Sequence, residues 1–219
     1  MPIPPFLKQK TRDAARVARP SAGYDLGTMA LTEPPPNPHE CGAQLRAALR
    51  VAASALNEHG PRFALAGSYA LWSYGAPEPS HDVDLVVGTA DVAAAIATLR
   101  DAGFAIERPP EDWLFKARAD DTLVDVLHRV NGVRVDACFL DRAEWRDVLA
   151  VRMPVLPPTM VMTQKLLALH EHHCDFAKLL PAARAVRERI DWEAVRKDVD
   201  DNDYAVAFLV LVERLGLTD

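Results

Sequence analysis

The sequence has no apolar run that approaches the roughly 20 residues needed to cross a bilayer. Its first residues, MPIPPFLKQKTRDAAR, lack the apolar segment of a secretory signal. Only 3 of its 219 residues are cysteines, namely Cys41, Cys138 and Cys174. An odd number of widely separated cysteines is typical of reduced thiols and not of a disulfide framework. These absences predict a cytoplasmic protein with no membrane partner.

The chain also lacks an excess of basic residues, because its formal net charge is -6 at pH 7. Proteins that bind nucleic acid over much of their surface are usually basic, so this class is disfavoured. A local basic face for one end of an RNA or for a nucleoside triphosphate stays compatible with that charge. The apolar fraction of 49% and the charged fraction of 26% are typical of a globular protein.

Three regions are predicted from the composition. Residues 1–39 are rich in proline, with three in a row at 34–36, and poor in large apolar side chains, so we expect a flexible N-terminal extension. Residues 40–140 carry the candidate chemistry and are expected to form a catalytic domain. Residues 141–219 are expected to form a helical C-terminal region.

Helices and strands alternate at the start of the predicted catalytic domain. Apolar residues at helical spacing predict a helix over residues 40–60, ended by glycine and proline. A short apolar strand follows at 63–66, then a helix that opens at Gly67-Ser68 and ends near Gly75. A second strand is expected at 82–87, followed by a third helix that ends before residue 103.

An antiparallel arrangement is expected next. The pattern predicts strands at 113–118, 122–130 and 133–140, the last two joined by a type I′ turn at Asn131-Gly132. In that register Asp125 and Asp136 lie on the same face of the hairpin. Beyond it, helices are expected at 143–150 and 159–174 and in the segments up to the C-terminus. The fold class predicted is therefore α+β, a small mixed sheet flanked by helices and followed by a helical part.

Two carboxylates dominate the second predicted strand. Alternate strand residues point to one side, so Asp82 and Asp84 project together. Like charges this close repel, and burial adds to the cost unless a cation neutralises them. Carboxylate oxygens suit Mg²⁺, and two or three carboxylates can hold a pair of such ions. The start of the helix at Gly67-Ser68 is a candidate seat for phosphate.

This ordered set resembles the polymerase-β-type nucleotidyltransferase superfamily, whose pattern is a Gly-Ser turn, a D-x-D strand and a later strand acid. The resemblance implies that Gly67 and Ser68 contact the triphosphate of an NTP, and that Asp82 and Asp84 bind Mg²⁺, with two ions expected. The third acid is Asp125 or Asp136. Asp125 is favoured because its V-D-V setting resembles lincosamide-type nucleotidyltransferases, while Asp136 has arginines nearby as ion-pair partners.

The segment KLLALHEHHCDFAKLL is similar to the helical part of the AbiEii-like and MenT-like toxin nucleotidyltransferases. That resemblance implies that Lys165 meets the nucleotide phosphates, with catalytic importance, and that Asp175 is a substrate-binding acid. On one continuous helix His172 would share the face of Lys165. The sequence departs from these toxins at Glu78, where an arginine is often found.

Three functions follow from these observations. The first is a toxin-type enzyme that adds nucleotides to tRNA 3′ ends, with a cognate antitoxin as a candidate partner. The second is an antibiotic-type nucleotidyltransferase with a small-molecule acceptor. The third is a catalytically inert nucleotide-binding module. A basic stretch in the C-terminal region is either a solvated helix face or a contact for acceptor RNA; its residues are Arg184, Arg187, Arg189, Arg196 and Lys197.

Overall fold

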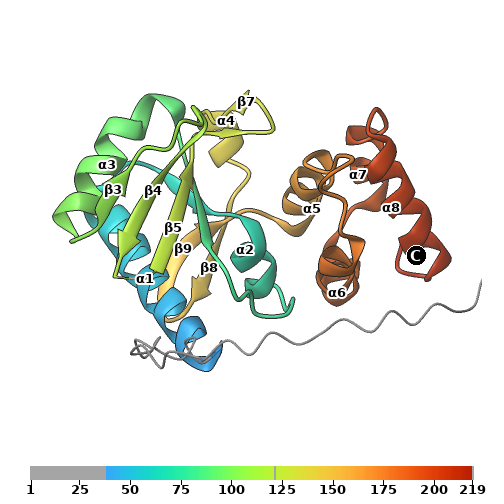
Figure 1. The fold of residues 1–219 in the computed structure, drawn as a ribbon, viewed down its shortest axis with the longest axis horizontal. Helices are drawn as coiled ribbons and strands as arrows, with labels where there is room; N and C mark the ends of the chain where they lie inside the picture. Colours follow the sequence, from blue (N-terminus) through green and yellow to red (C-terminus); the bar gives the residue numbers. More distant parts are fainter. Residues whose placement is uncertain (1–37, 121, 219) are drawn as a thin grey trace, which may run out of the picture. The chain divides into compact units, whose positions relative to one another are not determined.

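A computed structural model describes residues 38–120 and 122–218. The extension predicted for residues 1–39 lies outside this range except for its last two residues, which begin helix α1. None of the described helices is both long and apolar enough to cross a membrane. Figure 1 shows the fold, with labels on its main helices and on several of its strands.

A seven-stranded mixed sheet is the centre of the fold, with strand order β3-β4-β5-β2-β1-β9-β8. Strand β2 pairs antiparallel with β1 on one side and parallel with β5 on the other. The strands are β1 (Phe63–Leu65), β2 (Val83–Val87), β3 (Ala105–Glu107), β4 (Leu114–Ala119), β5 (Thr122–Leu127), β8 (Glu144–Val148) and β9 (Val151–Val155).

Helices cover the sheet and form the C-terminal part, as predicted for an α+β fold. Helix α1 packs against β5 and β9 (Figure 1). Helix α2 packs against β2. The helices are α1 (Pro38–His59), α2 (Gly67–Ser73), η1 (Thr89–Asp91), α3 (Val92–Asp101), α4 (Ala137–Leu140), α5 (Pro158–Leu167), α6 (Phe176–Val186), η2 (Arg187–Arg189), α7 (Trp192–Asp198) and α8 (Asp203–Arg214).

Strand β2 is placed by burial of its apolar residues. Val83, Leu85 and Val87 are fully buried and point away from Asp84, because side chains alternate along a strand. Val83 and Leu85 lie beside Val124 and Val126 of β5 in the parallel register. The strand therefore packs three apolar residues on one face, and it holds Asp84 beside the buried Val86 on the other.

The hairpin predicted at residues 122–140 is shorter than expected. Asn131 and Gly132 form the turn, with φ of 49° and 80°, between β6 (Arg129–Val130) and β7 (Val133–Arg134). The strand prediction for 135–140 is wrong, because the Asp136 carboxylate accepts a hydrogen bond from the Phe139 N–H and begins helix α4. An aspartate that caps a helix start competes effectively with strand pairing. Asp136 is therefore not across the hairpin from Asp125.

The helix predicted at 143–150 is also wrong, since the segment forms β8 and turns back into β9. The turn residues Leu149 and Ala150 have φ of 52° and 62°. Two-residue hairpin turns with positive φ usually contain glycine or asparagine, so the pair Leu149-Ala150 gives no recognisable turn signal in the sequence. Strand β9 pairs in parallel with β1, which extends the sheet beyond residue 140.

The single helix predicted for 159–174 is interrupted. Helix α5 ends at Leu167, and α6 begins after Asp175, whose carboxylate accepts from the Ala177 N–H. Lys165 and His172 therefore do not share a helix, contrary to the prediction. The helices expected further along the chain are confirmed as α6, α7 and α8.

Candidate active site

Three carboxylates meet at the end of the central strands. One oxygen each of Asp82, Asp84 and Asp125 lies within 4.8 Å of the other two. Asp84 and Asp125 are direct neighbours in the parallel pairing of β2 with β5. Asp82 immediately precedes β2, two residues from Asp84, and so lies on the same side. The parallel register brings Asp125 to the pair without any contribution from the hairpin.

Burial makes this cluster costly for negative charge. Burial, together with the nearby charges of Asp82 and Asp125, raises the pKa of Asp84 from 3.8 to about 7, and Lys165 opposes the shift. The pKa of Asp125 is also raised, first by burial, and Lys116 opposes the shift. The Oδ1 atom of Asp125 is buried and accepts no hydrogen bond from the described part of the chain.

Such a donor set fits a hard divalent cation. Three carboxylates offer oxygen ligands of the kind that Mg²⁺ binds, and the ion would supply the charge that the protein does not. A buried Asp125 oxygen without a hydrogen-bond donor among the described residues fits the role of a metal ligand. The geometry of the described residues therefore suits the predicted metal site.

Gly67 allows Asp84 to occupy its position. The residue has a φ of +57°, and a Cβ placed on it would lie 1.8 Å from the Asp84 Oδ2 atom. No side chain could be accommodated there without moving the carboxylate. The glycine of the Gly-Ser turn is thus required both by backbone conformation and by the close approach of the acid.

Ser68 and Lys165 are brought together from positions 97 residues apart. The Lys165 Nζ donates a hydrogen bond of 3.1 Å to the Ser68 Oγ. Ser68 lies at the start of α2, which has no side-chain cap among the described residues. The first N–H groups of α2 and a cationic side chain therefore face the same place, next to the carboxylates.

Three other residues singled out in the sequence have structural partners. Asp175 begins α6 and its Oδ2 lies 3.5 Å from the Lys178 Nζ. Asp136 caps α4 and is not part of the carboxylate cluster. Glu78 pairs with Arg46 of α1.

Two cavities border the carboxylate cluster, and Lys165 lines both. The first, of about 500 Å³, is also lined by Ser68, Asp82, Asp175 and Lys178, and we call it the α6 cavity. The second, of about 580 Å³, lies towards the β6–β7 hairpin, and we call it the hairpin cavity. Its lining includes Gly67, Asp84, Trp113, Arg129 and Gln164.

A larger cavity, of about 930 Å³, lies between α1 and α3 and is lined by residues such as Val51 and Ala97. Its lining includes none of the three clustered carboxylates, whereas Asp82 lines the α6 cavity and Asp84 the hairpin cavity. The volume of a cavity therefore does not identify the candidate active site of this protein.

Lys116 is a site residue that sequence reasoning missed. It faces Asp125 in the antiparallel pairing of β4 with β5, and its Nζ lies 3.7 Å from the Asp125 Oδ1. The short connection between the predicted strands at 113–118 and 122–130 could have located it, because that connection sets the register of the pair.

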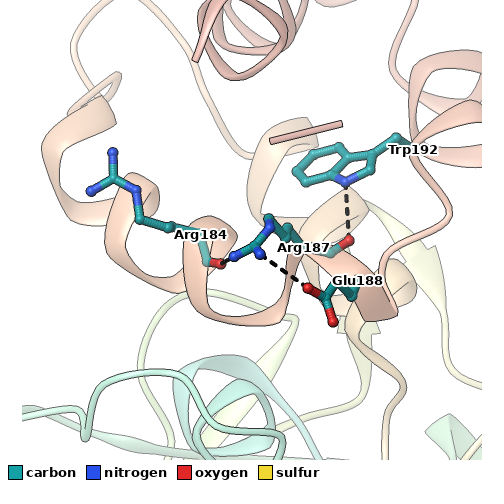
Figure 2. A network of polar contacts seen from close by, with 4 residues as sticks. All are labelled: Arg184, Arg187, Glu188 and Trp192. Carbon is teal, nitrogen blue, oxygen red and sulfur yellow. Dashed lines mark hydrogen bonds and ion pairs between the residues drawn. The ribbon is translucent and has the colours of Figure 1, made fainter. Parts of the chain in front are cut away.

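Part of the basic stretch is engaged inside the C-terminal helices. Arg187 donates to the Arg184 carbonyl and to Glu188, and the Trp192 indole donates to the Arg187 carbonyl (Figure 2). The distances are 3.3, 3.0 and 3.2 Å. Arg196 lies 3.9 Å from Glu213. These contacts support the solvated-helix interpretation for several members of the stretch.

No protein-family model matches the sequence, and no curated protein is similar to it in sequence. Solved structures do match. The crystal structure of ANT(2″)-Ia in complex with adenylyl-2″-tobramycin has a TM-score of 0.53 at 13% identity, over 75% of this chain and 97% of that chain.

Two further structures match less closely. The lincosamide antibiotic adenylyltransferase LnuA has a TM-score of 0.46 at 12% identity, over 62% of this chain and 92% of its own. The nucleotidyltransferase toxin MenT4 of Mycobacterium tuberculosis has a TM-score of 0.41 at 13% identity, over 73% of this chain and 63% of its own. With its mixed sheet, flanking helices and carboxylate triad, the chain has the fold of the polymerase-β-type nucleotidyltransferases.

Proposed function

We propose that the protein is a metal-dependent nucleotidyltransferase that moves NMP from an NTP to an acceptor hydroxyl and releases pyrophosphate. The observation that carries the proposal is the meeting of Asp82, Asp84 and Asp125 within 4.8 Å, on the strands of a nucleotidyltransferase-type sheet. A cluster of three acids, from the exposed Asp82 to the buried Asp125, with fewer lysines than acids beside it among the described residues, is the arrangement that phosphoryl-transfer chemistry uses.

The three acids would hold Mg²⁺, with two ions as the proposed number. When bound, the metal supplies positive charge that stabilises the attacking and leaving oxygens at phosphorus. Asp84 is the most central ligand, because it lies between Asp82 along the chain and Asp125 across the sheet. Lys116 would keep Asp125 oriented across β4 and β5.

The triphosphate would lie in the α6 cavity. Supporting this, Ser68 at the uncapped start of α2 lines that cavity, and Lys165 is hydrogen-bonded to Ser68. Gly67 would allow the phosphates to approach the backbone, and Lys165 would neutralise their charge. Asp175 also lines this cavity and orients Lys178, which is the basis for its proposed substrate-binding role.

Asp125 would accept the proton of the acceptor hydroxyl. Its carboxylate adjoins Asp84 in the parallel register, beside the proposed metal site. The proton leaves the hydroxyl as its oxygen attacks the α-phosphorus, and pyrophosphate departs from the opposite side. Asp136 is not among the clustered acids, and its carboxylate instead caps α4.

For the acceptor we propose RNA, in the sense of a toxin that adds nucleotides to tRNA 3′ ends, with a cognate antitoxin as the proposed protein partner. The KLLAL segment supports this, because it supplies Lys165 to the candidate site. A small-molecule acceptor is the second candidate, favoured by Glu78 and the V-D-V sequence of β5. A cytoplasmic location is proposed with either acceptor.

The test is labelled NMP transfer by the purified protein, with each NTP, Mg²⁺ and total RNA. Asp82→Ala should lower transfer on the order of a hundredfold or more, since one metal ligand is lost. Asp82 is exposed, so the fold should survive. Asp101→Ala, which removes an exposed acid from the end of α3, is the matched control and should transfer normally. Full activity of Asp82→Ala would contradict the proposal.

Experiments in cells distinguish the two candidate acceptors, and a binding measurement tests the inert alternative. Growth arrest on induction that Asp82→Ala relieves supports the toxin, whereas drug resistance without arrest supports a small-molecule acceptor. An NTP-dependent rise in melting temperature with no transfer under any metal would instead indicate the inert nucleotide-binding module.

A further inference from the structure

The hairpin cavity has an exposed aromatic ring on a fixed piece of backbone. Trp113 is 43% exposed, although it directly precedes β4. Its carbonyl accepts hydrogen bonds from the N–H groups of His128 and Arg129, at 2.9 and 3.2 Å. The Trp113 side chain therefore lines the cavity from a backbone position that two hydrogen bonds hold, and it is not packed into the core.

The hairpin and α5, which form another side of the hairpin cavity, are also joined by a hydrogen bond. The Asn131 side-chain amide donates to the Gln164 carbonyl at 3.0 Å, which joins the tip of the hairpin to α5. Arg129 lies 3.4 Å from Asp112, and its buried Nε makes no hydrogen bond to any described residue. The cavity is therefore assembled from the start of β4, the hairpin and α5, with donors already in place.

The charges of this lining restrict the acceptor. Apart from Asp84 of the triad, the acidic residue in the lining is Asp112, and Arg129 pairs with it. A polycationic aminosugar would meet no unpaired carboxylate here other than the metal-binding one. A planar ring that stacks on Trp113, with a phosphate near Arg129 or Lys165, is compatible with the same lining.

We propose, on the basis of the proposed nucleotidyl transfer, that the hairpin cavity receives the terminal nucleotide of a single-stranded RNA acceptor and that its base stacks on Trp113. Asp84 lines this cavity, so the terminal hydroxyl lies next to the triad. The hydroxyl oxygen forms the new bond to the α-phosphorus of the NTP, its proton passes to Asp125, and the bond to the leaving pyrophosphate breaks.

The experiment measures RNA binding apart from turnover. A fluorescein-labelled single-stranded RNA pentanucleotide is titrated with protein by anisotropy, in Mg²⁺ and without NTP. Trp113→Ala should weaken binding roughly ten- to a hundredfold, the effect typical of losing one stacked base. Trp113→Phe should restore most of the affinity, because its ring still stacks. ATP binding, measured by calorimetry, should stay unchanged in both variants.

Trp145→Ala is the matched control. Trp145 is 61% exposed on β8, and it lines a different cavity beside Leu56 and Pro154. This variant should bind RNA and ATP as the wild type does. Tryptophan fluorescence gives a second measurement that does not depend on Trp113→Ala. RNA should quench the fluorescence of the wild type and of Trp145→Ala, and quench that of Trp113→Phe much less.

Several results would overturn the inference. They are equal RNA affinity of Trp113→Ala and Trp145→Ala, loss of ATP affinity in Trp113→Ala, or tight Trp113-dependent binding of tobramycin as a polycationic probe. Absence of NMP transfer by the wild type, with Trp113-dependent RNA binding intact, would contradict the proposed function alone.

Discussion

At position 67 the presence of glycine is explained by Asp84 as much as by the turn. The missing Cβ leaves room for a carboxylate that would otherwise lie 1.8 Å from it. The residue therefore links the local conformation of the Gly-Ser turn to the position of a proposed metal ligand. Local sequence signals and the chemistry of the site coincide at this residue.

Gly67→Ala should abolish NMP transfer, because the new methyl group displaces the Asp84 carboxylate. Gly216→Ala is the matched control, since Gly216 has a similar φ of +63° and no described atom lies within 4 Å of the place that its Cβ would take. Both variants should lose roughly 1 kcal/mol of stability through the positive φ. Thermal unfolding and labelled transfer measure the two effects, and normal transfer by Gly67→Ala would show that Asp84 does not need its present position.

Among the elements, α5 and α8 are joined by one side chain. The Asn202 amide donates to the carbonyls of Leu166, Leu167 and Leu169, and its Oδ1 accepts from the first N–H groups of α8. One residue therefore ends α5 just after Lys165 and begins α8. This arrangement explains why the helix stops at Leu167 although the sequence pattern continues.

Asn202→Ala should lower the stability of the protein by about 1–2 kcal/mol, because two helix ends lose their partner. Asn202→Asp keeps the acceptor for α8 but removes the donors to α5. Hydrogen exchange should then accelerate at residues 166–169 in both variants, and at the start of α8 in Asn202→Ala alone. Unchanged exchange at 166–169 in both would show that the end of α5 is held by other contacts.

For the whole molecule, the carboxylate cluster makes stability depend on pH and metal. The pKa of Asp84 rises from 3.8 to about 7 on folding, so the folded protein keeps a proton that the unfolded chain releases near pH 4. This contribution is fully present below pH 4 and is lost as the pH rises through 7. A divalent cation should offset the loss, because it replaces the proton.

Without divalent ions at pH 8, Asp84→Asn should therefore melt several degrees above the wild type, and the difference should shrink towards pH 5. Millimolar Mn²⁺ should raise the melting temperature of the wild type but not of Asp84→Asn. Asp101→Asn, the control for loss of an exposed charge, should follow the wild type. A metal-free Asp84→Asn that is no more stable at pH 8 would show that the Asp84 carboxylate is not strained by burial.

The sequence by itself determined the elements whose signals are local. Helical spacing located α1, the Asn-Gly pair located the β6–β7 turn, and strand alternation placed Asp82 and Asp84 on one side. These features depend on neighbours a few residues apart, so their cause is visible in the chain itself. The α+β class followed from the same local patterns.

Tertiary structure alone decided the rest, because its causes lie far apart in the chain. The parallel register of β2 with β5 brings Asp125 to the triad, while Asp136 starts a helix instead. The β8–β9 turn has no glycine or asparagine, and its hairpin is stabilised by pairing with β1, which a local pattern cannot report. Lys165 reaches Ser68 across 97 residues, and only the folded chain shows that contact.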